Sequence, residues 1–283
     1  MTQVIDCPPS QATSANLPVD LAAIKTKQRG MWSSGDFSVI GTTLQEVGES
    51  VCEAVDLGAG STVLDVACGN GNAALAAARR FCNVTGLDYV PALLARAEQR
   101  AAAEGVIVTF VEGDAEALPF EDASFDVALS TYGVMFAPDQ ERTARELIRV
   151  VREGGAIGLA NWTPEGFVGR MLKTVGKHVP PPAGVASPIY WGSEARLSEL
   201  FKGVRSLRVE RRHFVFRYGS ANHFITVFRD YYGPTYKAFG ALDDAGKIRL
   251  TEDLRALITE FGRSTRSGAL AIPAEYLEVV IER

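Results

Sequence analysis

The sequence is poor in the residues that build metal sites and disulfide frameworks. Its 283 residues include four cysteines and three histidines. The cysteines, at positions 7, 52, 68 and 82, show no C-x-x-C spacing, so the sequence predicts no metal site. A few scattered cysteines are typical of a protein kept in a reducing compartment, and we expect a cytoplasmic location.

The chain also lacks a long apolar run, a targeting segment and an excess of positive charge. No stretch approaches the roughly 18 apolar residues of a transmembrane helix, and residues 1–20 have neither the basic start nor the apolar run of a signal peptide. The net charge of −5 disfavours a general nucleic-acid-binding protein. One basic cluster is interpreted as the solvated side of a strand; it comprises Arg205, Arg208, Arg211, Arg212 and Arg217.

Between residues 57 and 162, the chain shows a regular alternation of strand and helix patterns. Such alternation predicts a parallel, doubly wound α/β sheet. Strands are expected near residues 62–67, 83–88, 106–111, 125–130 and 155–161, and helices near 73–80, 91–104 and 139–152. Helical patterns near 21–29 and 42–55 precede this unit, and residues 1–18 are expected to form a flexible tail.

After residue 162 the alternation stops. Helical patterns are expected over 165–177, 221–239 and 245–261, and the chain closes with an alternating strand over 276–282. A further strand over 206–217 has apolar residues at odd positions first and at even positions later. This change of phase predicts a β-bulge near Arg211–His213.

The most informative stretch is Val63–Asn72. An apolar run carries one acid, Asp65, and opens into a turn at Gly69 and Gly71, where an alanine-rich helix begins. Glycine lets the backbone approach a ligand because it has no Cβ. The next strand ends in a second acid, Asp88, which can accept hydrogen bonds from ribose hydroxyls. The pattern predicts a nucleoside-containing cofactor.

Two kinds of cofactor fit this turn. Gly69-x-Gly71-x-x-Ala74 matches the fingerprint of dinucleotide-binding proteins, so an NAD-dependent oxidoreductase is one alternative. Asp65 argues against it, because a pyrophosphate at the turn would lie near a buried negative charge. A ligand that carries an ammonium and a sulfonium group would instead be attracted to that charge.

Later segments favour the second kind of cofactor. They follow the turn in a fixed order: Val111–Phe120, Ser124–Ser130 and Leu147-x-x-Val150-x-x-x-Gly154-Gly155. From about Val63 to Trp162 this order resembles the class I S-adenosylmethionine (SAM) dependent methyltransferases, especially the branch with the ubiquinone and menaquinone biosynthesis enzymes. One departure is Ala67, where many members have a glycine; an alanine is tolerated there if its φ is negative.

The resemblance implies a fold and a cofactor site. The implied fold is a Rossmann-like, seven-stranded sheet of order 3-2-1-4-5-7-6 with the last strand antiparallel, in a single domain at residues 19–283 with N-terminal helices and an inserted helical cap. The implied ligand is SAM, with S-adenosylhomocysteine (SAH) as the product. The implied contacts are Asp65 and the Ser130 carbonyl on the amino group, the Ala67 and Gly69 backbone along the methionine portion, Asp88 on the ribose, and Tyr89, Asp114 and Ala115 on the adenine.

The methyl acceptor is expected to be a small molecule bound by two cap segments, at residues 163–195 and 219–265. Aromatic side chains in such positions suit a flat or apolar acceptor. The candidate pocket residues are Trp32, Tyr132, Trp162, His178, Tyr231 and Tyr232, of which His178 and Tyr132 are also the candidates for a catalytic group. A phenol- or quinol-like oxygen is the first expectation for the accepting atom, with nitrogen, carbon and sulfur open. A SAM-binding protein without transferase activity is a further alternative.

Overall fold

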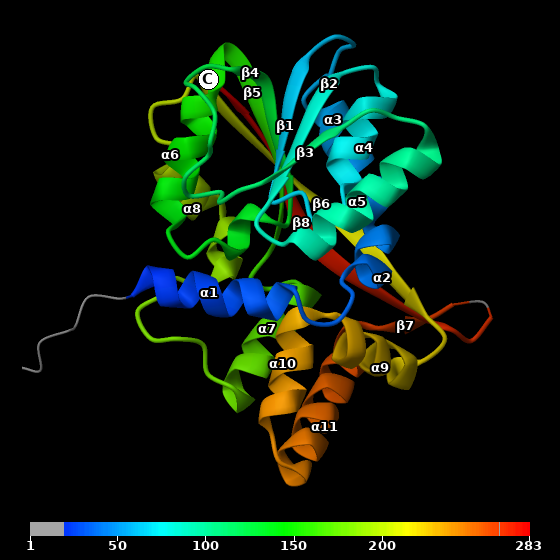
Figure 1. The fold of residues 1–283 in the computed structure, drawn as a ribbon. Coiled ribbons are helices and arrows are strands. Elements are labelled where there is room, and N and C mark those ends of the chain that lie inside the picture. The colour runs from blue at the N-terminus through cyan, green and yellow to red at the C-terminus, as the bar shows by residue number, and fades with distance from the viewer. Residues whose placement is uncertain (1–19, 266) are drawn as a thin grey trace, which may run out of the picture.

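The computed structural model describes residues 20–265 and 267–283, so the tail expected at residues 1–18 lies outside the described residues. One twisted sheet runs through the molecule in the order β3-β2-β1-β4-β5-β8-β6, with β7 paired to β8 (Figure 1). The strands are β1 Thr62–Val66, β2 Asn83–Asp88, β3 Thr109–Glu112, β4 Phe125–Thr131, β5 Val151–Trp162, β6 Ser206–Tyr218, β7 Arg263–Ser264 and β8 Leu270–Glu282.

The strand directions confirm the expected topology. Strands β1 to β5 run parallel to one another, whereas β8 is inserted antiparallel between β5 and β6. The expected order 3-2-1-4-5-7-6 therefore holds, with β8 as the seventh strand and β7 as a two-residue addition. Strand β1 is apolar apart from one acid because both of its faces are covered, which is usual for a central parallel strand.

Helices cover both faces of the sheet. Helices α3, α4 and α5 lie on one side of it, and α6 and α8 lie on the other (Figure 1). None of the helices in the described ranges is long and apolar enough to cross a membrane. The helices, including the short 3-10 turns η1 to η3, are α1 Leu21–Trp32, α2 Ser38–Gly41, η1 Thr42–Leu44, α3 Gln45–Ala54, α4 Asn72–Arg79, α5 Pro91–Glu104, η2 Val134–Phe136, α6 Gln140–Val150, α7 Phe167–His178, η3 Pro188–Gly192, α8 Glu194–Leu200, α9 Ala221–Tyr231, α10 Gly233–Ala241 and α11 Asp244–Phe261.

Local sequence explains where these helices begin and end. Helix α5 starts with Pro91 and stops at Gly105, which adopts a left-handed conformation with φ of +67°. Proline suits the first helical turn because it has no N–H to leave unpaired, and glycine suits the left-handed stop. Asp139 caps α6 by accepting a hydrogen bond from the backbone N–H of Arg142.

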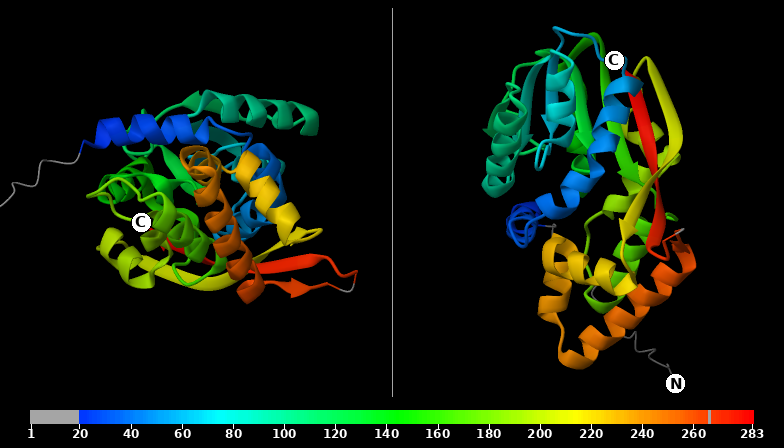
Figure 2. Two further views of the ribbon diagram at one scale, coloured as in Figure 1. Left: turned by 90° about the horizontal axis from the view of Figure 1, so that it is seen from below. Right: turned by 90° about the vertical axis from the view of Figure 1, so that its right-hand side faces the viewer.

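A second layer of helices lies below the carboxyl ends of the strands and consists of α7, α9, α10 and α11 (Figures 1 and 2). Its core is aromatic: Phe167 of α7 packs edge-to-face on Phe224 of α9, which stacks on Phe228. Helix α1 crosses between this layer and the sheet (Figure 1). This arrangement leaves the carboxyl edge of the sheet enclosed on several sides.

The expectation of a β-bulge in β6 is wrong. The pairing of β6 with β8 continues without a shift through Arg211–His213. Even-numbered side chains share one face along the whole strand, where Arg208 donates to the Ala54 carbonyl of α3 and Phe216 packs against Phe224. The apolar pattern changes phase because the odd-numbered face is half-buried at the start of the strand and the even-numbered face is buried farther along. The arginines of this strand are exposed, and Arg211 forms ion pairs with Glu194 and Glu275.

Candidate active site

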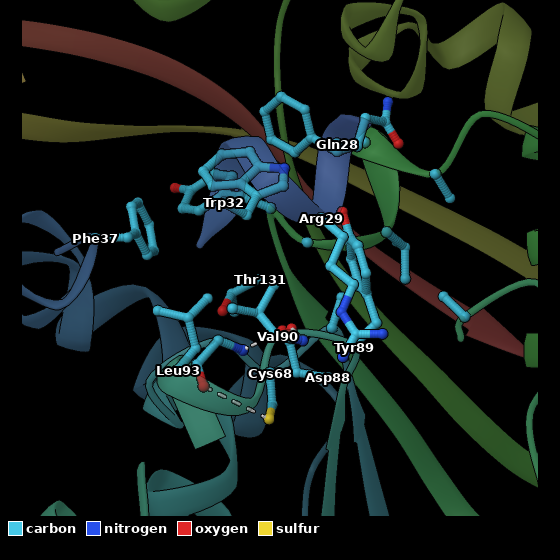
Figure 3. A pocket seen from close by; sticks show the side chains of 18 of the residues that line it. Gln28, Arg29, Trp32, Phe37, Cys68, Asp88, Tyr89, Val90, Leu93 and Thr131 are labelled. Carbon is cyan, nitrogen blue, oxygen red and sulfur yellow. Dashed lines mark hydrogen bonds between the residues drawn. The ribbon is translucent and has the colours of Figure 1, made fainter. Parts of the chain in front are cut away.

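A cavity of about 490 Å³ lies at the carboxyl edge of the parallel strands. The turns after β1, β2, β3 and β4 form one wall, α1 forms a second, and residues of the lower helical layer and β6 complete it (Figure 3). Ligands of doubly wound sheets bind at this edge, and the volume is typical of a small-molecule site. The cavity has a polar half near β2 and β3 and an aromatic half toward the lower helices.

Every second residue of the turn after β1 has a left-handed backbone conformation. Ala67, Gly69 and Gly71 have φ values of +52°, +55° and +86°. The expectation of a negative φ at Ala67 is therefore wrong, and this alanine holds a conformation that favours glycine. Gly133, which follows β4, makes room for it: a Cβ on Gly133 would lie 2.3 Å from the Ala67 carbonyl oxygen. The two turns are thus in direct backbone contact.

Asp65 lies beneath this turn, 1% exposed, and it is not part of the cavity wall. Its Oδ2 accepts a hydrogen bond of 2.8 Å from the backbone N–H of Ala74, near the start of α4. Burial raises the pKa of Asp65 to about 8; the Ala74 hydrogen bond opposes this, and the nearby Asp88 charge adds to it. The sequence-based placement at the strand end is confirmed, but the side chain also serves the helix start.

Two buried polar atoms at the turn have no hydrogen-bond partner among the described residues. They are the Asp65 Oδ1, an acceptor, and the Asn70 Nδ2, a donor. Asn70 is 2% exposed and belongs to the cavity wall. One unpaired acceptor and one unpaired donor fit the ammonium and carboxylate groups at the amino-acid end of SAM.

Asp88 joins the ends of two neighbouring elements. Its Oδ2 accepts from the Gly69 N–H at 2.8 Å, and its Oδ1 accepts from the Val90 N–H at 2.9 Å, where α5 begins. The side chain borders the cavity (Figure 3). Each carboxylate oxygen can accept two hydrogen bonds, so both retain capacity for ligand hydroxyls. Burial raises the pKa of Asp88 to about 6, against the opposing backbone hydrogen bonds.

The loop after β3 supplies more charge than the sequence alone suggested. Asp114, Ala115 and Tyr89 all line the polar half, as expected. Asp114 also accepts a hydrogen bond of 2.6 Å from the Lys25 Nζ of α1. The same Nζ lies 2.5 Å from the Glu116 Oε2. Lys25 and Glu116 were not predicted, because a lysine on an N-terminal helix gives no local sign of the loop that it meets.

Ser130 is fully buried behind the wall rather than on it. Its hydroxyl donates to the Val66 carbonyl at 2.7 Å and accepts from the Val134 N–H at 3.2 Å. It thereby ties the end of β4 to the end of β1. The next residues, Thr131 and Tyr132, form the wall itself.

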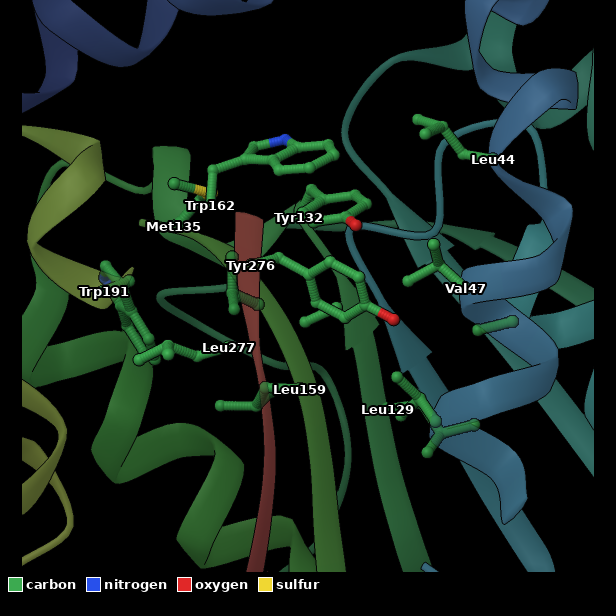
Figure 4. Packing of buried hydrophobic residues seen from close by; sticks show 14 of the residues in the cluster. Leu44, Val47, Leu129, Tyr132, Met135, Leu159, Trp162, Trp191, Tyr276 and Leu277 are labelled. Atoms are coloured by element: carbon green, nitrogen blue, oxygen red, sulfur yellow. The ribbon is translucent and has the colours of Figure 1, made fainter. Parts of the chain in front are cut away.

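The other half of the cavity is aromatic. Tyr132 has a φ of +64°, and its ring stacks parallel on Trp162 with centroids 3.9 Å apart (Figure 4). Trp32 of α1 makes edge-to-face contacts with Phe136 and Tyr232, at 4.9 and 5.7 Å between centroids. Burial raises the pKa of Tyr132 well above its usual range, so its hydroxyl stays protonated. This half suits a flat, apolar ligand.

Two of the expected pocket residues lie elsewhere. The His178 Nε2 is 2.7 Å from the Asp253 Oδ2, where it joins α7 to α11, and His178 is not among the residues that line the cavity. Tyr231 is exposed on α9 and does not line the cavity either. Tyr232, one residue later, points inward because α9 ends there and the chain turns into α10.

Comparisons of the sequence agree with this geometry. The family described as a methyltransferase domain matches residues 64–159. The chain is 42% identical over 242 residues to the uncharacterised protein Rv1403c of Mycobacterium tuberculosis, covering 84% of this chain and 88% of that protein. It is 39% identical over 116 residues to the demethylmenaquinone methyltransferase of Thermus thermophilus, covering 39% of this chain and 53% of that enzyme.

Solved structures share the fold at lower identity. The YcgJ protein of Bacillus subtilis has a TM-score of 0.57 at 20% identity, covering 84% of this chain and 99% of that chain. A phosphoethanolamine N-methyltransferase of Haemonchus contortus, solved with SAM, has a TM-score of 0.53 at 17% identity, covering 84% of this chain and 52% of that chain. The chain belongs to the class I SAM-dependent methyltransferases, and it shares a family with the M. tuberculosis protein.

The strained turn at Ala67 leads to a stability prediction. A left-handed alanine costs about 1–2 kcal/mol, whereas the extra freedom of glycine in the unfolded chain costs about 0.4–1 kcal/mol. Ala67→Gly should therefore leave the free energy of unfolding unchanged or raise it by up to about 1.6 kcal/mol. The matched control Ala95→Gly, at an exposed position within α5, should lower it by about 1 kcal/mol. Urea denaturation measures both; equal losses would show that Ala67 is not strained.

Proposed function

We propose that the protein transfers the methyl group of SAM to a small, flat and largely apolar acceptor, with a phenol- or quinol-like oxygen as the accepting atom. The observation that carries this proposal is the division of one cavity into a polar half beside the glycine turn and an aromatic half beneath it. The similarity to a demethylmenaquinone methyltransferase supports a flat, quinone-like acceptor and not the choice of oxygen as the accepting atom.

In this proposal the polar half holds the cofactor. The unpaired Asp65 Oδ1 attracts the ammonium group through a water, and the Ala67 and Gly69 backbone follows the methionine chain. Asp88 accepts from the ribose hydroxyls with the lone pairs that Gly69 and Val90 leave free. The adenine ring lies against Tyr89 between Asp114 and the Ala115 N–H. Ser130 acts from behind the wall by fixing β4 to β1.

The aromatic half would hold the acceptor. The two cap segments, 163–195 and 219–265, reach it through Val168, Phe228 and Tyr232. Trp32 and the stacked pair of Tyr132 and Trp162 come from outside those segments. Flat rings favour such walls because edge-to-face and stacked contacts add to the burial of apolar surface.

SAM supplies an electrophilic methyl group on a positively charged sulfur, so the chain has to align the acceptor rather than activate a leaving group. The Tyr132 hydroxyl is buried without a partner among the described residues and stays protonated, so it cannot take the proton of the acceptor. His178 stands outside the cavity, which leaves it without a direct role in the reaction. A phenol or quinol suits these residues better than an alcohol because its hydroxyl, with an ordinary pKa of about 10, gives up its proton to water far more easily.

The expected reducing location also remains a proposal. Cys52, Cys68 and Cys82 are buried and unpaired. Burial raises the pKa of the Cys52 thiol to about 12 and that of Cys68 well above its ordinary value. Such thiols are inert packing groups rather than nucleophiles, which supports a cytoplasmic protein.

The direct test of the proposed function combines binding and turnover. Calorimetry should show saturable binding of SAM and SAH and none of NAD. Incubation with SAM and a panel of phenols, hydroquinones, amines and thiols should yield SAH and a methylated product with the oxygen acceptors. Methylation of amines alone would refute the acceptor class, and SAM binding without any turnover would favour a non-catalytic protein.

The cofactor site should bind more tightly as the pH rises. With a pKa of about 8, Asp65 is largely protonated at pH 6.5 in the free protein, and binding an ammonium group should ionise it and release a proton. The affinity for SAH should therefore rise by up to about tenfold per pH unit between pH 6.5 and 8 and level off above. Asp65→Asn keeps an acceptor for the Ala74 N–H but should abolish the rise. The same slope in both proteins would remove Asp65 from the site.

The acceptor half can be altered without the cofactor half. Tyr232→Leu removes a ring that contacts Trp32 and should raise the acceptor KM by about tenfold, while the Kd for SAH changes by less than about threefold. Tyr231→Leu, its exposed neighbour, should change neither value. Steady-state kinetics with the best phenol of the panel and calorimetry with SAH measure both. A loss of SAH affinity in folded Tyr232→Leu would show that the two halves are not separate.

A further inference from the structure

Helix α1 covers both halves of the cavity. It contributes wall residues along its length, namely Lys25, Thr26, Gln28, Arg29 and Trp32. Gln28, Arg29 and Trp32 lie over the opening from the side opposite the strand ends (Figure 3). The same helix therefore borders the loop after β3 with its first turns and the aromatic half with its last turn.

At the polar half, ion pairs join α1 to the loop after β3. The Lys25 Nζ lies 2.6 Å from the Asp114 Oδ2 and 2.5 Å from the Glu116 Oε2. Glu116 is 2% exposed, and its Oε1 accepts from the Asp139 N–H at 2.8 Å. Burial alone would lower the pKa of Lys25, but its two carboxylate partners raise it, so the ammonium stays charged. Lys25 is thus the cation that balances a buried carboxylate.

Two further attachments complete the cover. The Arg29 Nη2 lies 2.6 Å from the Glu112 Oε1, and both side chains are about half exposed. At the other end, Trp32 packs edge-to-face on Phe37, with centroids 5.6 Å apart, besides its contacts with Phe136 and Tyr232. The ion pair is weak because water screens exposed charges, and each aromatic contact contributes about 0.5–1.5 kcal/mol.

The other contacts of α1 are few. Ile24 is its one buried side chain, and its last turn packs against α10, where a Cβ on Gly233 would lie 2.7 Å from the Met31 carbonyl oxygen. The turn after α1 contains Gly35, which has a φ of +72°. A Cβ on Gly35 would lie 3.0 Å from the Tyr231 carbonyl oxygen. A helix with few buried contacts and a glycine in its connection opens at low cost compared with the sheet.

We propose that α1 is a single lid over cofactor and acceptor, latched by Lys25 between Asp114 and Glu116, so that both ligands pass through one opening. The proposal rests on the proposed function for the identity of the two ligands. Opening detaches Lys25 from Asp114, the residue assigned to adenine, and withdraws Trp32 from the aromatic half. The two halves therefore open together, and neither ligand exchanges while the lid stays closed over the other.

If Lys25 latches the lid, its removal should change the rates of SAH binding and release rather than the affinity for SAH. Lys25→Met keeps the length of the side chain but removes its charge. Because the latch is closed in the free protein as well as in the SAH complex, association and release of SAH should both become about tenfold faster, with the Kd changed by less than about threefold. Release of radiolabelled SAH, chased with unlabelled SAH, and stopped-flow binding measure the two rates.

Arg79→Met is the matched control. Arg79 joins ion pairs with Glu49 and Glu104 away from the cavity, and its loss should leave both rates unchanged. Salt provides a measurement that needs no variant: release from the native protein should accelerate with ionic strength, and more steeply than release from Lys25→Met. A weaker Kd with unchanged release, or release that ignores both salt and Lys25, would overturn the latch.

Trp32→Leu tests whether the lid is shared. Trp32 lies at the acceptor end of α1, so faster SAH release in this variant, with unchanged thermal unfolding, would support one lid over both halves. Normal SAH release in Trp32→Leu would overturn the shared opening even if Lys25→Met releases SAH quickly. These experiments use SAH alone, so a wrong acceptor class would appear in the methylation panel and leave them unaffected.

Discussion

The carboxylate of Asp88 is the interaction on which the site depends. It fixes the glycine turn through Gly69 and the start of α5 through Val90, and it does so at the end of β2, where two turns must meet a ligand. Holding a buried carboxylate there is costly, as its raised pKa shows. Together with the backbone contact between Gly133 and Ala67, it makes three strand ends one rigid surface.

The sequence predicted the sheet and the gathering of acids at its carboxyl edge, because both follow from local patterns. Alternating strands and helices define a parallel sheet, and acids at strand ends gather at its carboxyl edge without further information. Strand β2 and helix α5 were expected at the residues where they lie, since Pro91 and Gly105 mark the helix ends chemically. Asp88 and Asp114 line the cavity for the same reason.

What the sequence could not show depends on contacts between distant segments. The phase change in β6 looks like a bulge until the burial of each face of the strand is known. The left-handed Ala67 depends on the space that Gly133 leaves for it. Lys25 carries no local sign of its partners Asp114 and Glu116. His178 was a reasonable candidate by type, but its position on α7 directs it to Asp253.

The insertion of β8 between β5 and β6 has a consequence for the order of assembly. Within the described residues, β6 pairs only with β8, the last strand of the chain. Phe216 of β6 is part of the aromatic wall, so that wall cannot close until β8 has been synthesised. The polar half needs only α1 and residues up to β4 and its following turn. As the chain leaves the ribosome, the residues of the polar half are therefore all present well before those that complete the aromatic half.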